Sequence, residues 1–221
     1  LGAGDDGHSP GSGGDAPGMN KVIGTLYKKF KGKLYACRAG YRGLINNDIV
    51  SMKEFKPLDF INQSGSVIKC SRCDAFKEEE KFNHALENAK RFDVVVVIGG
   101  NGSLKGAERL AEAGVKTIFI PATIDNDIEG SEYSLGYHTA IKAGVETYRN
   151  IMPSFDAHER CLVMEVMGNK CDNLLKAISK ICQPTFQIAS LKELAYDDIA
   201  KELLLNKEKG EPSSIIIKDN I

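Results

Sequence analysis

A short run of branched apolar residues followed directly by glycines limits the possible folds of this chain more than any other feature. Residues 94–98 read VVVVI, and Gly99, Gly100, Asn101, Gly102 and Ser103 come next. A continuous apolar run of this length is typical of a strand buried on both faces of a sheet. A buried strand that opens through glycines into a helix presents backbone N–H groups to phosphate. The pattern predicts an α/β fold with an anion-binding turn after residue 98.

Strands and helices are predicted to alternate through most of the chain, with short connections between them. This alternation predicts a three-layer, Rossmann-like α/β fold, in which a mostly parallel sheet has helices on both faces and binds ligands at the carboxyl ends of its strands. The expected strands cover residues 34–39, 49–52, 93–98, 117–120, 161–166, 185–188 and 214–217, and the expected helices cover 19–30, 78–91, 103–113, 135–152, 172–182 and 197–207.

A pair of carboxylates follows the strand expected at 117–120. Asp125 and Asp127 are two residues apart in backbone that we expect to be extended, so their side chains should point the same way. One carboxylate can then accept a proton while the other holds a metal or a substrate hydroxyl. The alternative is a solvated turn, because Asn and Asp are common in turns and hydrogen-bond their own backbone. Together with the glycine turn, the pair suggests phosphoryl transfer.

Two further segments are candidates for phosphate contacts. Residues 12–20 are rich in glycine and lead into the expected helix 19–30, so Gly14 lies in a possible phosphate loop, although such a stretch is also typical of a linker. Arg72 ends a polar loop at residues 63–72 and has the geometry to clamp a phosphate, although loop arginines are often simply solvated.

The composition excludes several classes of function. The chain has 29 basic and 30 acidic residues, which argues against general binding to nucleic acid or to an anionic membrane surface. No apolar run approaches the ~20 residues needed to cross a bilayer, and no signal-peptide pattern opens the chain. The six cysteines are scattered and fit a reducing compartment, so we expect a cytoplasmic protein.

Several motifs occur in an order and at a spacing that identify a family. In these motifs, residues 12–217 resemble a 6-phosphofructokinase. The resemblance is to the ATP-dependent type, because pyrophosphate-dependent members have Asp where this chain has Gly102 and Lys where it has Ala122. The motifs are SGGDAPGMN at 12–20, GGNGS at 99–103, PATIDND at 121–127, GSEYSLG at 130–136 and EVMG at 165–168.

The resemblance implies phosphoryl transfer from ATP to the 1-hydroxyl of fructose 6-phosphate in glycolysis, with Mg²⁺. It also implies a homo-oligomer, a dimer or a tetramer, because the family's sites are shared between subunits. Residues 1–11 would be a flexible segment, 12–135 a nucleotide-binding domain and 136–221 part of a sugar-phosphate domain. The implied roles are Asp125 as general base; Thr123 and Asp127 beside it for sugar phosphate and metal; Arg72, Gly14, Gly102 and Ser103 for ATP; and Arg160, Met167 and Gly168 for the sugar phosphate.

The chain also departs from the family pattern. Asn101 stands where the family has an aspartate that supports magnesium, and a neutral amide is a poorer ligand for this cation. Asn169 replaces an arginine and Lys69 a glycine, and residues 1–11 lack the apolar character of the family's first strand. A second hypothesis is therefore a non-catalytic regulatory or structural homologue that binds nucleotide or sugar phosphate. A third is a nucleotide-binding domain for another sugar or polyol phosphate.

Overall fold

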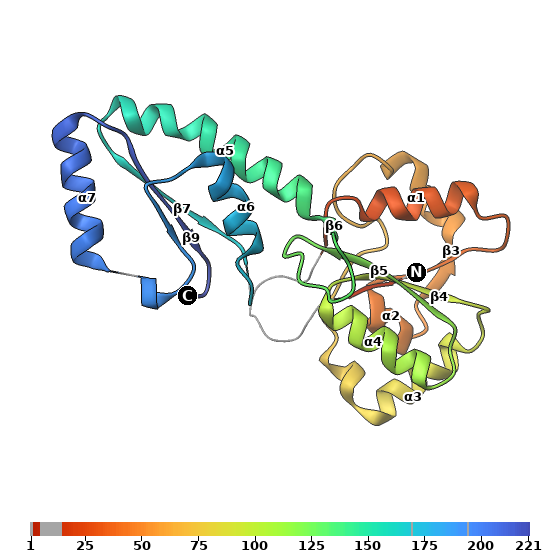
Figure 1. The fold of residues 1–221 in the computed structure, drawn as a ribbon. Helices are drawn as coiled ribbons and strands as arrows, with labels where there is room; N and C mark the ends of the chain where they lie inside the picture. The colour runs from red at the N-terminus through yellow and green to blue at the C-terminus, as the bar shows by residue number, and fades with distance from the viewer. Residues whose placement is uncertain (1, 5–14, 169, 194) are drawn as a thin grey trace. The chain divides into compact units, whose positions relative to one another are not determined.

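The computed structural model describes residues 2–4, 15–168, 170–193 and 195–221. The chain divides into two compact units, Leu1–Gly136 and Tyr137–Ile221, which are taken separately here (Figure 1). The predicted α/β class is confirmed, and each unit has its own parallel sheet. No helix in the described ranges is both long enough and apolar enough to cross a membrane.

The first unit is built on a parallel four-stranded sheet in the order β1-β4-β5-β6. In the register of the two central strands, Val97 lies beside Phe119 and Gly99 beside Pro121. The carboxyl ends of β4 and β5 therefore emerge at the same edge of the sheet. The strands are β1 (Gly2–Gly4), β4 (Val95–Gly99), β5 (Thr117–Thr123) and β6 (Leu135–Gly136).

Helices cover both faces of this sheet. Successive side chains of a strand point to opposite faces, so each strand packs against helices on both sides. Figure 1 shows α1 on one side of the strands and α2, α3 and α4 on the other. Ile98 and Ala122 share a core cluster with Met19 of α1, whereas Val97 packs with Leu110 of α4. The helices are α1 (Met19–Lys29), α2 (Gly40–Ile45), α3 (Glu79–Ala89) and α4 (Asn101–Glu112).

An antiparallel pair and short 3₁₀ turns complete the first unit. The sequence predicted the two strands but not α2, which is only six residues long. A helix of this length shows too little of the 3.6-residue period to be recognised; it is buried mainly through Tyr41 and Leu44. The elements are β2 (Tyr35–Cys37), β3 (Ile49–Ser51), η1 (Met52–Phe55), η2 (Pro57–Phe60) and η3 (Asp74–Lys77).

Three residues of the segment predicted to be flexible form a strand. Gly2–Gly4 forms β1 and pairs in parallel with residues 97–99 of β4. Sheet pairing is made by backbone hydrogen bonds, so a Gly-Ala-Gly segment can pair without the apolar side chains on which the sequence pattern depends. The rest of the predicted flexible segment, residue 1 and residues 5–11, lies outside the described residues.

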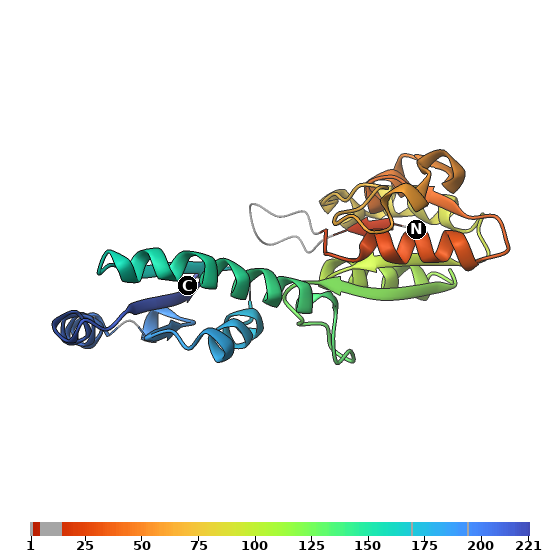
Figure 2. The same ribbon diagram turned by 90° about the horizontal axis from the view of Figure 1, so that it is seen from above.

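The second unit has a parallel three-stranded sheet in the order β7-β9-β8, so the last strand in sequence is the central one. The long helix α5 runs alongside β7 in both views (Figures 1 and 2), and α6 packs against α5. The elements are α5 (Tyr137–Ala157), β7 (Cys161–Val166), α6 (Asn173–Cys182), β8 (Phe186–Ile188), η4 (Leu191–Glu193), α7 (Tyr196–Lys209) and β9 (Ser213–Lys218).

Candidate functional site

The glycine turn after β4 leads directly into a helix N-terminus. Gly100 is the extended N-cap residue of α4, and Asn101, Gly102 and Ser103 form its first turn. The sequence placed the helix start at residue 103, so the structure moves Asn101 and Gly102 from a loop into the helix. The backbone N–H groups of a first helical turn have no carbonyl acceptor within the helix, and the helix dipole favours an anion there. This turn has the chemistry of a phosphate site.

Tyr41 of α2 is hydrogen-bonded to this turn. Its hydroxyl donates to the carbonyl of Ser103 at 2.6 Å, and Ser103 itself is fully buried. A Cβ atom on Gly106 would lie only 2.4 Å from Cζ of Tyr41, so the ring fits because residue 106 is glycine. Burial raises the pKa of Tyr41, which keeps its hydroxyl protonated as a donor. Sequence analysis missed this residue; the only signal for it was a glycine inside a helix.

The segment that carries Arg72 is connected to the same helix. Ser71 donates to the Ala39 carbonyl at 2.8 Å, and the ring of Phe76 stacks on Tyr41 with centroids 4.1 Å apart. Arg109 of α4 donates to the Phe76 carbonyl at 2.6 Å. Arg72 is half-buried between these two anchor points. Its segment is therefore attached to α2 through Ala39 and Tyr41, and to α4 through Arg109.

The carboxylate pair lies in the loop after β5. The Thr123 hydroxyl donates to Oδ2 of Asp125 at 3.3 Å and accepts from the Asp125 N–H at 3.2 Å. The extended backbone predicted here was wrong, because Asn126 has a left-handed φ of 53°. The argument that Asp125 and Asp127 point the same way therefore fails, since it holds only in extended backbone. The bend comes from Asn126, a residue type that tolerates left-handed backbone.

The residue types in these two loops are ones that magnesium takes when it is shared with a nucleotide. Asp125 and Asp127 are half-buried carboxylates after β5, and Asn101 adds an amide oxygen in the first turn of α4. Across the described ranges, no group of three or more His, Cys, Asp or Glu residues is arranged to hold a metal. Mg²⁺ does not need such a group, because it usually takes one or two carboxylates together with substrate phosphates and water.

In the second unit, β7 separates the residues predicted for the sugar phosphate. Met167 and Gly168 follow the carboxyl end of β7, whereas Arg160 precedes its amino end. Six residues of strand span about 20 Å. The Gly168 N–H donates to Oδ1 of Asp219 at 2.8 Å, and a Cβ on Gly168 would lie 2.6 Å from the Cys171 carbonyl oxygen. The structure thus brings Met167 and Gly168 together and leaves Arg160 at the other end of the strand.

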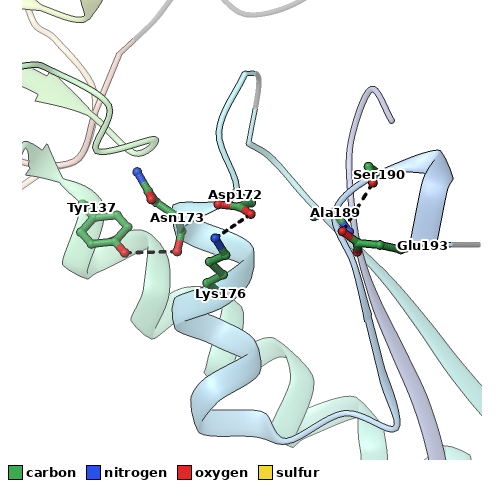
Figure 3. A network of polar contacts seen from close by, with 7 residues as sticks. All are labelled: Tyr137, Asp172, Asn173, Lys176, Ala189, Ser190 and Glu193. Carbon is green, nitrogen blue, oxygen red and sulfur yellow. Dashed lines mark hydrogen bonds and ion pairs between the residues drawn. The ribbon is translucent and has the colours of Figure 1, made fainter.

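Polar contacts hold the turns that follow β7 and β8 (Figure 3). Tyr137 donates to the carbonyl of Asn173 at 3.2 Å, and Lys176 pairs with Asp172 at 2.9 Å. That hydrogen bond with Asp172 raises the pKa of Lys176. After β8, Glu193 accepts from the Ala189 N–H at 2.8 Å. The first two contacts lie at the start of α6, and the third closes the turn after β8.

Other features do not belong to this site. Gly14 and Asn169 lie outside the described residues. A cavity of about 730 Å³ is lined by Val94, by residues 95–97 of β4, and by residues such as Leu34, Leu44 and Ile49. It lies beside the amino-terminal part of β4, away from the edge where Asn101 and Asp125 emerge.

Comparisons with known proteins agree with the geometry. The family model described as Phosphofructokinase matches residues 11–220. The ATP-dependent 6-phosphofructokinase of Clostridioides difficile is 35% identical over 93% of this chain and 66% of its own length. That of Macrococcus caseolyticus is 41% identical over 74% of this chain and 53% of its own length. The chain therefore spans about two thirds or less of these relatives.

Solved structures show the same fold. The T-state phosphofructokinase of Pichia pastoris has a TM-score of 0.77 at 26% identity, covering 94% of this chain and 25% of that one. A pyrophosphate-dependent phosphofructokinase from Nitrosospira multiformis has a TM-score of 0.76, and the match covers 94% of this chain and 59% of the Nitrosospira chain. Its sequence identity of 17% means that this likeness shows the fold alone. With the glycine turn, the Thr-Ile-Asp-Asn-Asp loop and the fold in agreement, this chain belongs to the phosphofructokinase family.

Proposed function

We propose that this chain transfers the γ-phosphoryl group of ATP to the 1-hydroxyl of fructose 6-phosphate. One observation carries the proposal: the N-terminus of α4 and the Thr123–Asp125 pair leave neighbouring parallel strands at the same edge. Such strands are about 4.8 Å apart. A phosphate-binding helix end and a proton acceptor are therefore adjacent, as in-line phosphoryl transfer requires.

In the reaction, the carboxylate of Asp125 accepts the proton of the sugar 1-hydroxyl as that oxygen attacks the γ-phosphorus and ADP leaves. Thr123 orients this carboxylate through its hydroxyl. The first-turn N–H groups of α4 at Gly102 and Ser103, with Gly14 and Arg72, stabilise the phosphate charge. Asp127 and Asn101 would hold magnesium, which would neutralise charge on the phosphates. Met167 and Gly168 contact the sugar phosphate.

The proposed enzyme is a homo-oligomer in the cytoplasm, a dimer or a tetramer, in which Arg160 serves the sugar site of a neighbouring subunit. Arg160 is exposed and stands apart from Met167 and Gly168 in its own chain. Large apolar side chains on the second unit are also exposed, among them Leu191 (64%), Tyr196 (72%) and Leu204 (62%). Sedimentation at micromolar concentration should show a dimer or a tetramer, and finding only monomer would contradict this.

The activity is tested by steady-state phosphorylation of fructose 6-phosphate with ATP and Mg²⁺. Asp125→Asn keeps the size of the side chain but removes the proton acceptor, so kcat should fall by about 10²–10⁴. The matched control is Asp93→Asn, because Asp93 is an exposed carboxylate just before the amino end of β4. Asn101→Asp should lower the magnesium concentration needed for half-maximal rate, since a carboxylate is a better ligand than an amide.

The second candidate function is the non-catalytic homologue, which Asn101 favours because its amide weakens the metal site. It predicts no turnover in the wild-type chain or in Asn101→Asp, together with retained ATP binding. The third, a kinase for another sugar or polyol phosphate, predicts ATP turnover that fructose 6-phosphate does not support and a different phosphorylated sugar does. Equal turnover in wild type and Asp125→Asn would overturn the assignment of the base.

A further inference from the structure

The loop that carries Asp125 is closed by a pair of polar side chains. It leaves β5 after Thr123 and returns to β6 at Leu135, and the two strands pair at its base through Ala122 with Leu135 and Thr123 with Gly136. Between these points the loop contains both Asp125 and Asp127. Its shape therefore decides where the two carboxylates lie.

Asn126 and Ser134 connect the two arms of this loop. The Asn126 amide accepts from the Ser134 N–H at 2.7 Å and donates to the Glu132 carbonyl at 3.3 Å. The Ser134 hydroxyl donates to the Thr123 carbonyl at 2.7 Å and also lies 3.2 Å from Oδ1 of Asn126. Ser134 is only 4% exposed, so water competes poorly for these contacts.

The backbone of Asn126 also shapes this loop. Its φ of 53° turns the chain between the two aspartates. Asparagine accepts this left-handed conformation more readily than most residues, and here its side chain is hydrogen-bonded in the same conformation. One residue thus makes the bend and fastens it to the returning arm.

These contacts lead to Asp125 through Thr123. The Thr123 carbonyl is held by Ser134, and its hydroxyl makes both contacts to Asp125, one with the carboxylate and one with the N–H. We propose that Asn126 and Ser134 are positioning residues that hold the Asp125 carboxylate in its reactive place. The idea rests on the proposed function for its kinetic consequence, but the contacts themselves can be tested without turnover.

The informative substitution is Asn126→Gly. Glycine adopts positive φ freely, so the bend survives while the three side-chain contacts disappear. The matched control is Asn47→Gly, because Asn47 also has a positive φ, 54°, and its side chain accepts one hydrogen bond, from Arg91 at 2.7 Å. Asn47 lies between α2 and β3, away from the loop.

Two readouts separate this inference from the proposed function. In Asn126→Gly, hydrogen exchange at the Asp125 N–H should speed up about tenfold or more, whereas Asn47→Gly should leave it unchanged. Kcat should fall about 10–100-fold with the KM for ATP nearly constant, because misplacement of the base affects the chemical step. Asn126→Asp retains an acceptor for the Ser134 N–H, so it should restore most of the Asp125 protection.

The outcomes are distinguishable. An unchanged exchange rate at Asp125 in Asn126→Gly overturns the positioning role, whether or not the wild type turns over. So does an unchanged kcat in a variant series where Asp125→Asn is inactive. If the wild type has no turnover but exchange at Asp125 responds as expected, the proposed function fails and the positioning of Asp125 stands.

Discussion

At the scale of single residues, Lys69 holds a backbone conformation that its side chain disfavours. Its φ is 65°, and its N–H donates to the Ser66 carbonyl at 3.0 Å, so the conformation is part of the turn before Arg72. For an L-residue other than glycine, left-handed backbone costs about 1–2 kcal/mol. In the family that this chain resembles, glycine occupies this position. Lys69 therefore holds strained backbone close to Arg72, a proposed ATP contact.

Lys69→Gly is expected to raise the free energy of unfolding by about 1 kcal/mol, because relief of the left-handed strain exceeds the entropy cost of glycine. Urea denaturation measures the change. Lys105→Gly is the matched control, since Lys105 is exposed within α4 and should lower stability by about 1 kcal/mol. Equal losses in both variants would show that Lys69 is not strained.

Cys37 is a second residue with a measurable signature. Burial raises the pKa of its thiol to about 12, whereas a free thiol has a pKa of about 8.5. At a pH between these two values, the Cys37 thiol has lost its proton in the unfolded chain and keeps it in the folded chain. The stabilisation is therefore complete below about pH 8.5 and disappears as the pH rises toward 12, at about 1.4 kcal/mol per pH unit from this group.

Cys37→Ala should make the free energy of unfolding less dependent on pH by that amount between pH 9 and 11. Urea denaturation at several pH values gives the slope, which is independent of any constant loss from the smaller side chain. A slope equal to that of the wild type would mean that the thiol titrates normally in the folded chain.

At the scale of elements, α2 and α4 meet at one close contact that supports the proposed nucleotide turn. Tyr41 reaches across to the Ser103 carbonyl, and Gly106 leaves the space for its ring. Phe76 of η3 stacks on the same ring. The position of the α4 N-terminus thus depends on a residue that contacts neither ATP nor sugar in the proposed reaction.

Gly106→Ala should lower the free energy of unfolding by about 1–3 kcal/mol, because the new methyl group overlaps the Tyr41 ring. The double variant Tyr41→Leu/Gly106→Ala should lose less than the sum of the two single variants, since leucine vacates the overlap. Glu108→Ala, at an exposed position of the same helix, is the control and should have little effect. Strict additivity in this thermodynamic cycle would contradict the contact.

At the scale of the whole molecule, the chain consists of two units with separate sheets. In the second unit the central strand, β9, comes last in the sequence and pairs with both β7 and β8. Its Ile216 is fully buried. The stability of this unit therefore depends on residues near the end of the chain, whereas the sheet of the first unit is made within residues 2–136.

Deleting residues 213–221 should abolish amide protection in β7 and α6 and leave protection in β4 and β5. Without β9, neither β7 nor β8 has its sheet partner among the described strands. Hydrogen exchange by mass spectrometry resolves the two units. Deletion of residues 220–221 alone is the control, because it spares both β9 and the Asp219 contact to Gly168. Loss of protection in both units would show that they unfold as one.

The sequence alone was sufficient for the α/β class, for most strands and helices, and for the family. These depend on local patterns. They are the apolar run before Gly99, the alternation of strand-like and helix-like hydrophobic patterns, and motifs of adjacent residues such as Thr123 to Asp127. The catalytic and binding roles of individual residues, Asp125 included, stay predictions. Local patterns survive in sequence because each reports the conformation of its own few residues.

Only the tertiary structure decided which distant residues meet. It placed β9 between β7 and β8, added the Gly2–Gly4 strand, set Tyr41 beneath Ser103, and joined Asn126 to Ser134. No periodicity encodes these pairs, because they are selected by the packing of side chains and by the need of buried polar groups for partners. The motif predicted that Asp125 matters, and the packed loop determines where its carboxylate lies.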